Sequence, residues 1–337
     1  MKAVRITDIA RAAEVSTATV SHALNGTGRM SDSTRRRVRE TAALLGYASR
    51  GGRPRTRTLG LAVNTYRTVA WNFLDVAYYA QAVAVATAVA HRHGYALSVL
   101  PSATGGGQAL DLDGVLLIDA PAEDPLTEAL RGSGTPVVFV GRPVDARTGD
   151  IWVGGDHTAA VRSVLDHLTG EGARRIALIA GPGTDSYTRD CLAAYHAWCA
   201  AHGQEPVAVP LVPGRGSDSA AHSLLARPDR PDAVYGIYNS SGRSLLDAAR
   251  HHGLRVPEDL LVACMSEDPA YATTDPPVTT LTLDPRAGLE TAVGALVAAV
   301  ESRGLHIPVT VPHRLTVRRS TQRERARGQE DRGVPRR

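Results

Sequence analysis

Apolar residues recur at helical spacing along two short segments at the start of the chain, and a tight turn separates these segments. Ser16 stands directly before the second segment, where a hydroxyl caps a helix N-terminus. The pattern predicts a helix-turn-helix within residues 5–25. The side chains expected to form its small core are Ile6, Ile9, Ala10, Ala13, Val15, Val20, Ala23 and Leu24.

A third helix is predicted to follow, with Ser31 as its cap and Gly46 as its stop. Its buried face is expected to carry Val38, Ala42 and Leu45, with arginines around it. Three helices form the smallest self-sufficient head of this kind. The alternative interpretation is a small helical bundle whose basic face is only solvated.

The exposed face of the second helix is expected to carry short polar groups. Such groups fit against phosphates and base edges in the DNA major groove. Cap, turn and polar helix face occur in the right order, which favours DNA binding over a solvated bundle. The residues on this face are Thr17, Ala18, Thr19, Ser21, His22 and Asn25.

The rest of the chain alternates short apolar runs with amphipathic stretches, which predicts parallel strands joined by helices in doubly wound α/β sheets. The expected strands are 59–63, 96–100, 114–118, 136–141, 175–180, 233–238 and 260–264. The expected helices are 71–93, 156–169, 189–202, 241–252 and 285–302.

A chain of 337 residues fits one small head and a large two-lobed core. It has no apolar run of 18 residues and no signal-peptide pattern, so we expect a soluble cytoplasmic protein without a membrane partner. The three cysteines have neither disulfide nor metal-ligand spacing. We expect no disulfide, metal or cofactor.

The positive charge is concentrated at the two ends of the chain. Residues 1–58 hold 12 Lys and Arg against 4 Asp and Glu, and residues 314–337 hold 9 against 3, whereas the whole chain carries only +4. A basic head favours a polyanion, with an affinity that falls steeply with salt. The basic residues at the C-terminus are expected to form a disordered tail.

Catalytic motifs are missing. Gly181-Pro182-Gly183 lacks the third glycine of a dinucleotide-binding loop, and no GxxxxGK[ST], GxSxG or HExxH occurs. The sequence therefore does not predict an enzyme.

The segments DIARAAEVSTATVSHALNG and TRRRVRETAALLGY resemble the DNA-binding head of the lactose-repressor (LacI/GalR) family of bacterial transcription regulators. The remainder is similar to the effector-sensing core of that family, through LGLAV at 59, RRIALIAG at 174, GLRVPEDLLV at 253 and PPVTTLTLD at 276. The resemblance implies a periplasmic-binding-protein type I core, in which the chain crosses three times between two lobes around a ligand cleft. It divides the chain into a head (1–47), a hinge arm (48–58), an effector-sensing and dimerisation core (59–320) and the tail (321–337).

The resemblance also assigns roles on the recognition helix. Thr17, Ala18 and His22 would face base edges, and Thr19, Ser21 and Asn25 would face phosphates. A histidine donates one hydrogen bond to guanine where an arginine donates two, so discrimination at His22 should be weaker. The full candidate set for double-stranded DNA is Thr7, Ser16, Thr17, Ala18, Thr19, Ser21, His22, Asn25, Arg29, Arg50, Arg53 and Arg55.

The hinge departs from the family. Relatives carry a short helix with a leucine that wedges into the minor groove, and about six residues including that leucine are missing here. Gly52-Arg53-Pro54, flanked by Arg50, Arg55 and Arg57, resembles an AT-hook, whose arginines lie along a narrow minor groove. The alternative is a plain flexible basic linker.

The effector site departs from the family as well. Sugar-binding relatives carry Asn-Asp and Asp-Asp where this chain has Asn239-Ser240 and Ser266-Glu267, and losing such acceptors costs on the order of 1.5–3 kcal/mol apiece. The small-molecule effector is therefore expected to be unusual. Candidate effector-binding residues, each with a structural role as the alternative, are Trp71, Asn72, Phe73, Tyr187, Arg189, Asn239, Ser266 and Glu267.

Three functions follow from these patterns. The leading one is an operator-binding regulator, a repressor, that binds a palindrome as a homodimer and responds to an effector in the cleft. The second is a constitutive or nucleoid-type DNA-binding protein whose core no longer senses a ligand. The third, a solute-binding protein or sugar enzyme, is disfavoured because both a signal peptide and a catalytic set are missing.

Overall fold

The computed structural model describes residues 5–25, 28, 30–45, 56–64, 72–100, 111–181, 184–211, 216–302 and 309–323. Two compact units make up the chain, residues 1–56 and residues 57–337. The predicted hinge arm up to residue 55, the stop at Gly46 and the tail from residue 324 lie outside the described residues.

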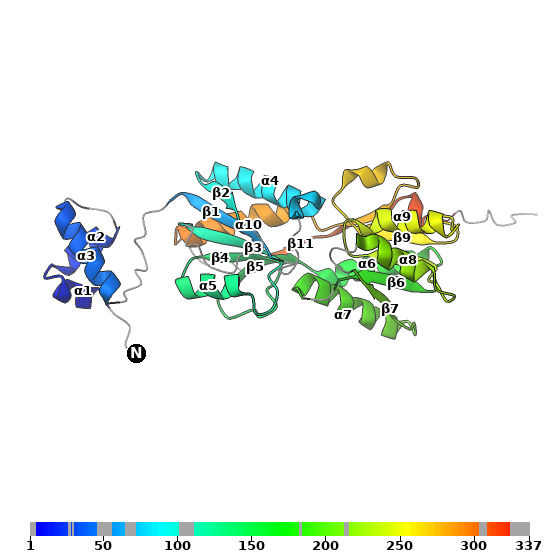
Figure 1. Ribbon diagram of the computed structural model, residues 1–337, viewed down its shortest axis with the longest axis horizontal. Helices are drawn as coiled ribbons and strands as arrows, with labels where there is room; N and C mark the ends of the chain where they lie inside the picture. The colour runs from blue at the N-terminus through cyan, green and yellow to red at the C-terminus, as the bar shows by residue number, and fades with distance from the viewer. Residues whose placement is uncertain are drawn as a thin grey trace, which may run out of the picture. The chain divides into compact units, whose positions relative to one another are not determined.

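The first unit contains the three predicted helices α1 (Ile6–Ala12), α2 (Thr17–Asn25) and α3 (Asp32–Leu44) (Figure 1). Leu45 is 39% exposed because it follows the last turn of α3, so its predicted burial is wrong. The core expected between α1 and α2 is confirmed, and α3 closes it. It consists of Ile9, Ala10, Ala13, Val20, Ala23, Leu24, Val38 and Ala42, with Ile6, Val15 and Met30 packed at its edge.

Hydrogen bonds at the helix ends fix the turn. The Ser16 Oγ accepts the Thr19 N–H at 3.0 Å, which confirms Ser16 as the cap of α2. At the end of α1 the Val15 N–H reaches the carbonyl of Ala10 at 3.0 Å, and Glu14 between the helices has a φ of +51°. This is the Schellman geometry that usually selects glycine at the position of Glu14.

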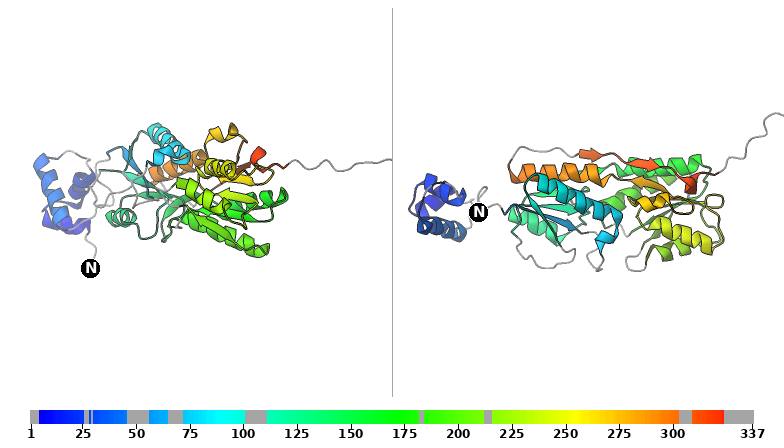
Figure 2. Two further views of the ribbon diagram at one scale, coloured as in Figure 1. Left: turned by 45° about the vertical axis from the view of Figure 1, so that its right-hand side comes forward. Right: turned by 90° about the horizontal axis from the view of Figure 1, so that it is seen from above.

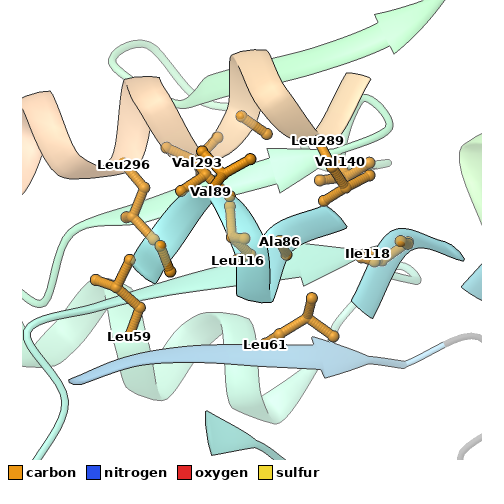
Figure 3. Packing of buried hydrophobic residues seen from close by; sticks show 14 of the residues in the cluster. Leu59, Leu61, Ala86, Val89, Leu116, Ile118, Val140, Leu289, Val293 and Leu296 are labelled. Atoms are coloured by element: carbon orange, nitrogen blue, oxygen red, sulfur yellow. The ribbon is translucent and has the colours of Figure 1, made fainter. Parts of the chain in front are cut away.

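The first lobe of the second unit is a parallel six-stranded sheet. Its strands, in the order β11-β5-β4-β3-β1-β2, are β1 (Thr58–Val63), β2 (Ala96–Val99), β3 (Gly114–Ile118), β4 (Val137–Val140), β5 (Ile151–Gly155) and β11 (Val309–Val311). Helices α4 (Ala77–Arg92) and α10 (Pro285–Val300) cover one face and α5 (Pro125–Ser133) the other, and the short turn η1 (Phe73–Asp75) precedes α4. Figure 3 shows Ala86 and Val89 of α4 and Leu289, Val293 and Leu296 of α10 packed on this sheet.

The second lobe has the strand order β12-β10-β9-β8-β6-β7, in which only β12 is antiparallel to its neighbour. Its strands are β6 (Ile176–Ala180), β7 (Val207–Pro210), β8 (Ala233–Gly236), β9 (Leu261–Met265), β10 (Thr279–Thr282) and β12 (Arg314–Thr316). Helices α6 (His157–Gly170) and α7 (Ser186–Ala201) cover one face, and α8 (Gly216–Leu225) and α9 (Ser241–His251) the other. Two short turns, η2 (Pro269–Ala272) and η3 (Arg319–Thr321), complete it.

The chain passes between the lobes three times, after β5, after β10 and after β11. Figure 2 shows the two lobes side by side with these connections between them. The predicted architecture of two doubly wound lobes is therefore confirmed, and each of the seven predicted core strands overlaps an observed strand.

Candidate functional site

The exposed face of the recognition helix α2 carries the predicted polar residues. Thr17, Ala18 and His22 are exposed, and Thr19 and Ser21 are half-buried at the edge of this face. The buried side of α2 supplies only apolar side chains to the core of the head. The first unit thus presents one polar helix face to solvent.

The other candidate DNA-binding residues fall into three groups. Thr7 at the start of α1 and Ser16 at the cap of α2 are exposed. The structure describes Asn25 only through its backbone. Arg29, Arg50, Arg53 and Arg55 lie outside the described residues.

Arg57, grouped with the hinge in the sequence, is attached to the core. Its N–H donates to Asp113 Oδ2 at 2.8 Å, and its guanidinium lies 5.3 Å from the ring centroid of Tyr95. This cation–π contact holds the side chain of Arg57 at the edge of the first lobe.

A cavity of about 440 Å³ lies between the two lobes of the second unit. Its wall is formed where parallel strands of both sheets reach their carboxyl ends: Asp119 follows β3, Tyr238 follows β8 and Met265 ends β9. Doubly wound sheets bind ligands at this edge, and the volume suits a small molecule. The cavity is the candidate effector site.

Two carboxylates lie in the inner part of the cavity wall. Asp119 accepts a hydrogen bond from the Tyr79 hydroxyl at 2.8 Å. Burial, reinforced by the charge of Asp185, raises the pKa of Asp119 to about 7. Asp185 caps α7 by accepting the Thr188 N–H at 2.8 Å and its hydroxyl at 3.0 Å, and burial raises the pKa of Asp185 as well. Burial disfavours the charged form of each carboxylate, so both bind a proton more readily than an exposed aspartate does.

Tyrosine rings form much of the remaining wall. The Tyr187 hydroxyl donates to the carbonyl of Ile237 at 2.7 Å, and its ring meets that of His157 edge to face at 5.0 Å. Tyr238 shares a hydrogen bond of 2.7 Å with the Thr188 hydroxyl. These anchored rings give the cavity rigid aromatic sides.

Of the eight candidate effector residues, Tyr187 and Asn239 border the cavity. Ser266 is buried behind Asn239, to which its hydroxyl donates. Glu267 accepts the Leu283 N–H at 2.7 Å and the Thr282 hydroxyl, so it ties β9 to β10 and does not line the wall.

The remaining candidates lie in other places. Asn72 caps η1 by accepting the Leu74 N–H at 3.3 Å, and Phe73 is buried in the first lobe. Arg189 is exposed on α7 and does not line the cavity, and Trp71 lies outside the described residues.

Sequence analysis missed four acidic residues of the wall, Asp75, Asp119, Asp185 and Asp284. Asp119 directly follows a predicted strand, and Asp284 precedes the Pro285 that opens a predicted helix. Both have positive φ, +53° and +49°. An acidic residue at the end of a predicted buried strand was the signal available in the sequence.

Within the residues that the structure describes, no group of His, Cys, Asp and Glu is arranged to hold a metal ion. The three cysteines are unpaired and buried. None of the described helices combines the length and the apolar composition needed to cross a bilayer.

Comparison with known families matches both units of the chain. Residues 5–49 match the family described as "Bacterial regulatory proteins, lacI family", and residues 165–321 match the "Periplasmic binding protein-like domain". An uncharacterised HTH-type transcriptional regulator in the aml 5' region of Streptomyces limosus is 31% identical over 88% of this chain and 88% of its own length. The HTH-type transcriptional regulator CelR of Thermobifida fusca is 29% identical over 81% of this chain and 85% of its own length.

Solved structures agree with these matches. The structure of a transcriptional regulator CelR–cellobiose complex superposes with a TM-score of 0.70 at 26% identity, over 94% of this chain and 99% of the other. The lac repressor dimer bound to operator and the anti-inducer ONPF superposes with a TM-score of 0.68 at 23% identity, over 96% of this chain and all of the other, and shows a shared fold.

Proposed function

Since this chain belongs to the lacI family of bacterial regulatory proteins, with a helix-turn-helix head and a periplasmic-binding-protein-like core, we propose that it is a repressor. It binds a palindromic operator as a homodimer in the cytoplasm. A small molecule in the cleft between the lobes changes the affinity of the dimer for that operator.

The observation that carries this proposal is the polar face of α2. Thr17, Ala18 and His22 are exposed on a helix whose Val20, Ala23 and Leu24 are buried in the core of the head. A helix that presents short polar groups in this way fits the major groove, where such groups reach base edges.

The proposed dimer follows from the small footprint of the head. One helix-turn-helix gathers few contacts to phosphates and bases, whereas two heads related by a two-fold axis match two half-sites one helical turn apart. The lac repressor, which shares this fold, is a dimer on its operator in the solved structure.

The proposed effector site follows from the cavity. Its place at the carboxyl ends of both sheets suits a ligand that bridges the lobes. The similar CelR was solved with cellobiose. Closure of the lobes around a ligand is the two-state element that an allosteric repressor needs.

The hinge arm extends the proposal. Arg53 and Arg55, on either side of Pro54, follow the minor groove at the operator centre in place of a wedged leucine. Replacing both by alanine should weaken binding more on A·T-rich than on G·C-rich operator centres. Equal losses on both would favour a plain basic linker.

Selection of bound sequences from a random duplex pool with the full-length protein tests the DNA-binding part. An enriched palindrome is expected. In the same selection, His22→Ala should flatten base preference at one symmetric pair of positions, because its imidazole supplies a single hydrogen bond there. Binding without an enriched motif would instead favour the constitutive or nucleoid-type DNA-binding protein.

A further inference from the structure

The cavity between the lobes is lined by acidic side chains without basic partners. Asp75, Asp119, Asp185 and Asp284 border it, and no Lys or Arg does so among the described residues of the wall. His157 is the one basic side chain there, and three other carboxylates remain when Asp119, whose pKa burial raises to about 7, binds a proton. The wall therefore carries a net negative charge.

Each of these carboxylates is held only by neutral donors. Asp119 accepts from a tyrosine hydroxyl at 2.8 Å, Asp185 from Thr188, Asp75 from Asn72 at 2.8 Å and Asp284 from a backbone N–H at 3.2 Å. In the described part of the chain, none of them has an arginine within 4 Å.

Some carboxylates elsewhere in the core do have such partners. Asp150 lies 2.5 Å from Arg131, and Asp268 lies 2.8 Å from Arg243. Other carboxylates, such as the buried Asp124 and the half-buried Glu267, are held by neutral donors, as those of the cavity are. A negative charge that is withdrawn from water is unfavourable unless a proton or a cation compensates it, so a cationic ligand would stabilise the ionised carboxylates of the wall.

The rest of the wall suits the organic part of a cation. Tyr78, Tyr79, Tyr187 and Tyr238 line the cavity together with Val140, Val153, Leu211 and Met265. Tyrosine faces attract ammonium groups, and cages of such rings recognise quaternary ammonium compounds. Apolar side chains between the rings favour a ligand with a hydrocarbon body.

The one histidine of the wall faces an acidic residue outside the cavity. The side chain of His157 is only 10% exposed, and its Nδ1 is buried without a hydrogen bond, 3.6 Å from Asp190. Asp190 does not border the cavity, so the close acidic neighbour of His157 lies outside the wall, and His157 makes no ion pair within 4 Å with the four aspartates of the cavity.

From this wall we propose that the effector is an organic cation, an amine or quaternary ammonium compound with an apolar body, and that neutral sugars are not its ligands. The inference rests on the proposed function only in assigning an effector to this cleft. Neutral sugars need donors as well as acceptors, and here the charged groups of the wall are almost all acceptors.

Matched ligand pairs test the proposal on the full-length protein by thermal unfolding. Choline is compared with its neutral isostere 3,3-dimethylbutan-1-ol, and glucosamine with glucose, each at 10 mM. The cation of at least one pair should raise the Tm of the core and its neutral partner should not. A Tm raised equally by both members of a pair, or by the neutral member alone, would overturn the proposal.

Two aspartates form a matched pair of variants for the same measurement. Asp185 and Asp124 are both buried caps that accept the N–H and hydroxyl of a threonine three residues later, but only Asp185 borders the cavity. Asp185→Asn should abolish the Tm rise given by the cation, and Asp124→Asn should leave it intact. Equal effects of the two variants would assign the loss to a weakened cap.

A covalent probe measures the charge of the cavity without any knowledge of the ligand. Ser240 borders the cavity and is exposed, whereas the three native cysteines are buried. The Ser240→Cys thiol is modified with trimethylammonium-ethyl and sulfonato-ethyl methanethiosulfonates, and Thr87→Cys on the exposed side of α4 is the control.

The ratio of cationic to anionic modification rates should be at least tenfold higher at position 240 than at position 87, and Asp119→Asn should lower it. This ratio decides the proposal if no tested compound raises the Tm: equal ratios at both positions would contradict it. Neither of these two measurements involves DNA. A negative result in them would therefore not affect the operator found by selection, and a failed operator selection would not affect the measured charge of the cavity.

Discussion

Gln81 of α4 in the first lobe donates its Nε2 to the backbone carbonyl of Glu267 in the second lobe at 3.0 Å. Two further contacts join the lobes, from the Ala122 N–H to the carbonyl of Thr184 at 3.4 Å and from the Ser186 hydroxyl to the carbonyl of Arg142. The cleft is thus held by hydrogen bonds that come from separate elements of each lobe.

Gln81→Ala should open the cleft more often. Losing one hydrogen bond of about 1 kcal/mol shifts an opening equilibrium by about fivefold. The neutral reagent methyl methanethiosulfonate should therefore modify Met265→Cys, which borders the cavity and is buried, up to about fivefold faster in the Gln81→Ala background. Thr87→Ala is the control, because the Thr87 hydroxyl donates only to Val83 within α4. An unchanged rate would show that Gln81 does not hold the lobes.

Asp119 should make the core less stable as the pH rises. Its pKa is raised from 3.8 to about 7 by burial and by the charge of Asp185, so the folded core binds a proton that the unfolded chain releases above pH 4. The stabilisation from this proton is complete below pH 4 and is lost as the pH rises through 7.

Asp119→Asn removes this dependence and keeps a residue that tolerates the positive φ of the site. The Tm difference, variant minus wild type, should therefore grow between pH 5 and pH 8. Thermal unfolding at each pH checks this; a constant difference would show that Asp119 has an ordinary pKa.

Ser16→Ala should weaken the head and its DNA binding together. The hydroxyl caps α2 and shares a hydrogen bond of 2.8 Å with the Thr19 hydroxyl, and losing such a cap costs about 1 kcal/mol. Ser31→Ala is the matched variant, since Ser31 caps α3 through Thr34 in the same way. Hydrogen exchange should report similar destabilisation for both variants, and anisotropy with duplex DNA should report the larger loss for Ser16→Ala.

Glu14→Gly should stabilise the head. Glu14 occupies the left-handed position of a Schellman turn, where a side chain is strained and glycine is not. We expect hydrogen exchange in α1 and α2 to become slower. The change should correspond to a gain of about 0.5–1 kcal/mol in the free energy of unfolding of the head. Glu40→Gly, on the exposed face of α3, is the control of opposite sign, because glycine inside a helix destabilises it by about 1 kcal/mol.

Much of the fold could be predicted from the sequence because its core elements have clear periodicity. Runs such as 114–118 are apolar throughout, as is typical of strands buried on both faces. Ser16 could be predicted as a cap because it stands directly before the second helix. The missed strands lack this signal. β5 contains Trp152 and ends in two glycines, and β11 and β12 have three residues each, too few for a period.

The effector site could be predicted less well. Its wall comes from residues up to 236 positions apart, Asp75 and Val311 among them, which only the tertiary fold brings together. Resemblance to relatives placed Arg189 and Glu267 at the site, but one is exposed on α7 and the other joins β9 to β10. No pattern in the sequence groups the tyrosines and aspartates of the wall, because only the fold places them around one cavity.

Coupling between cleft and head is the central claim, and one titration tests it most directly. Full-length protein is bound to a labelled duplex that carries the selected palindrome. Its Kd is measured by anisotropy with and without whichever of the four test compounds raises the Tm most. We predict that the compound changes the Kd at least fivefold, the lower end of ordinary allosteric coupling, and that Asp185→Asn removes the change. A Kd unaltered by a compound that demonstrably binds the core would contradict the account.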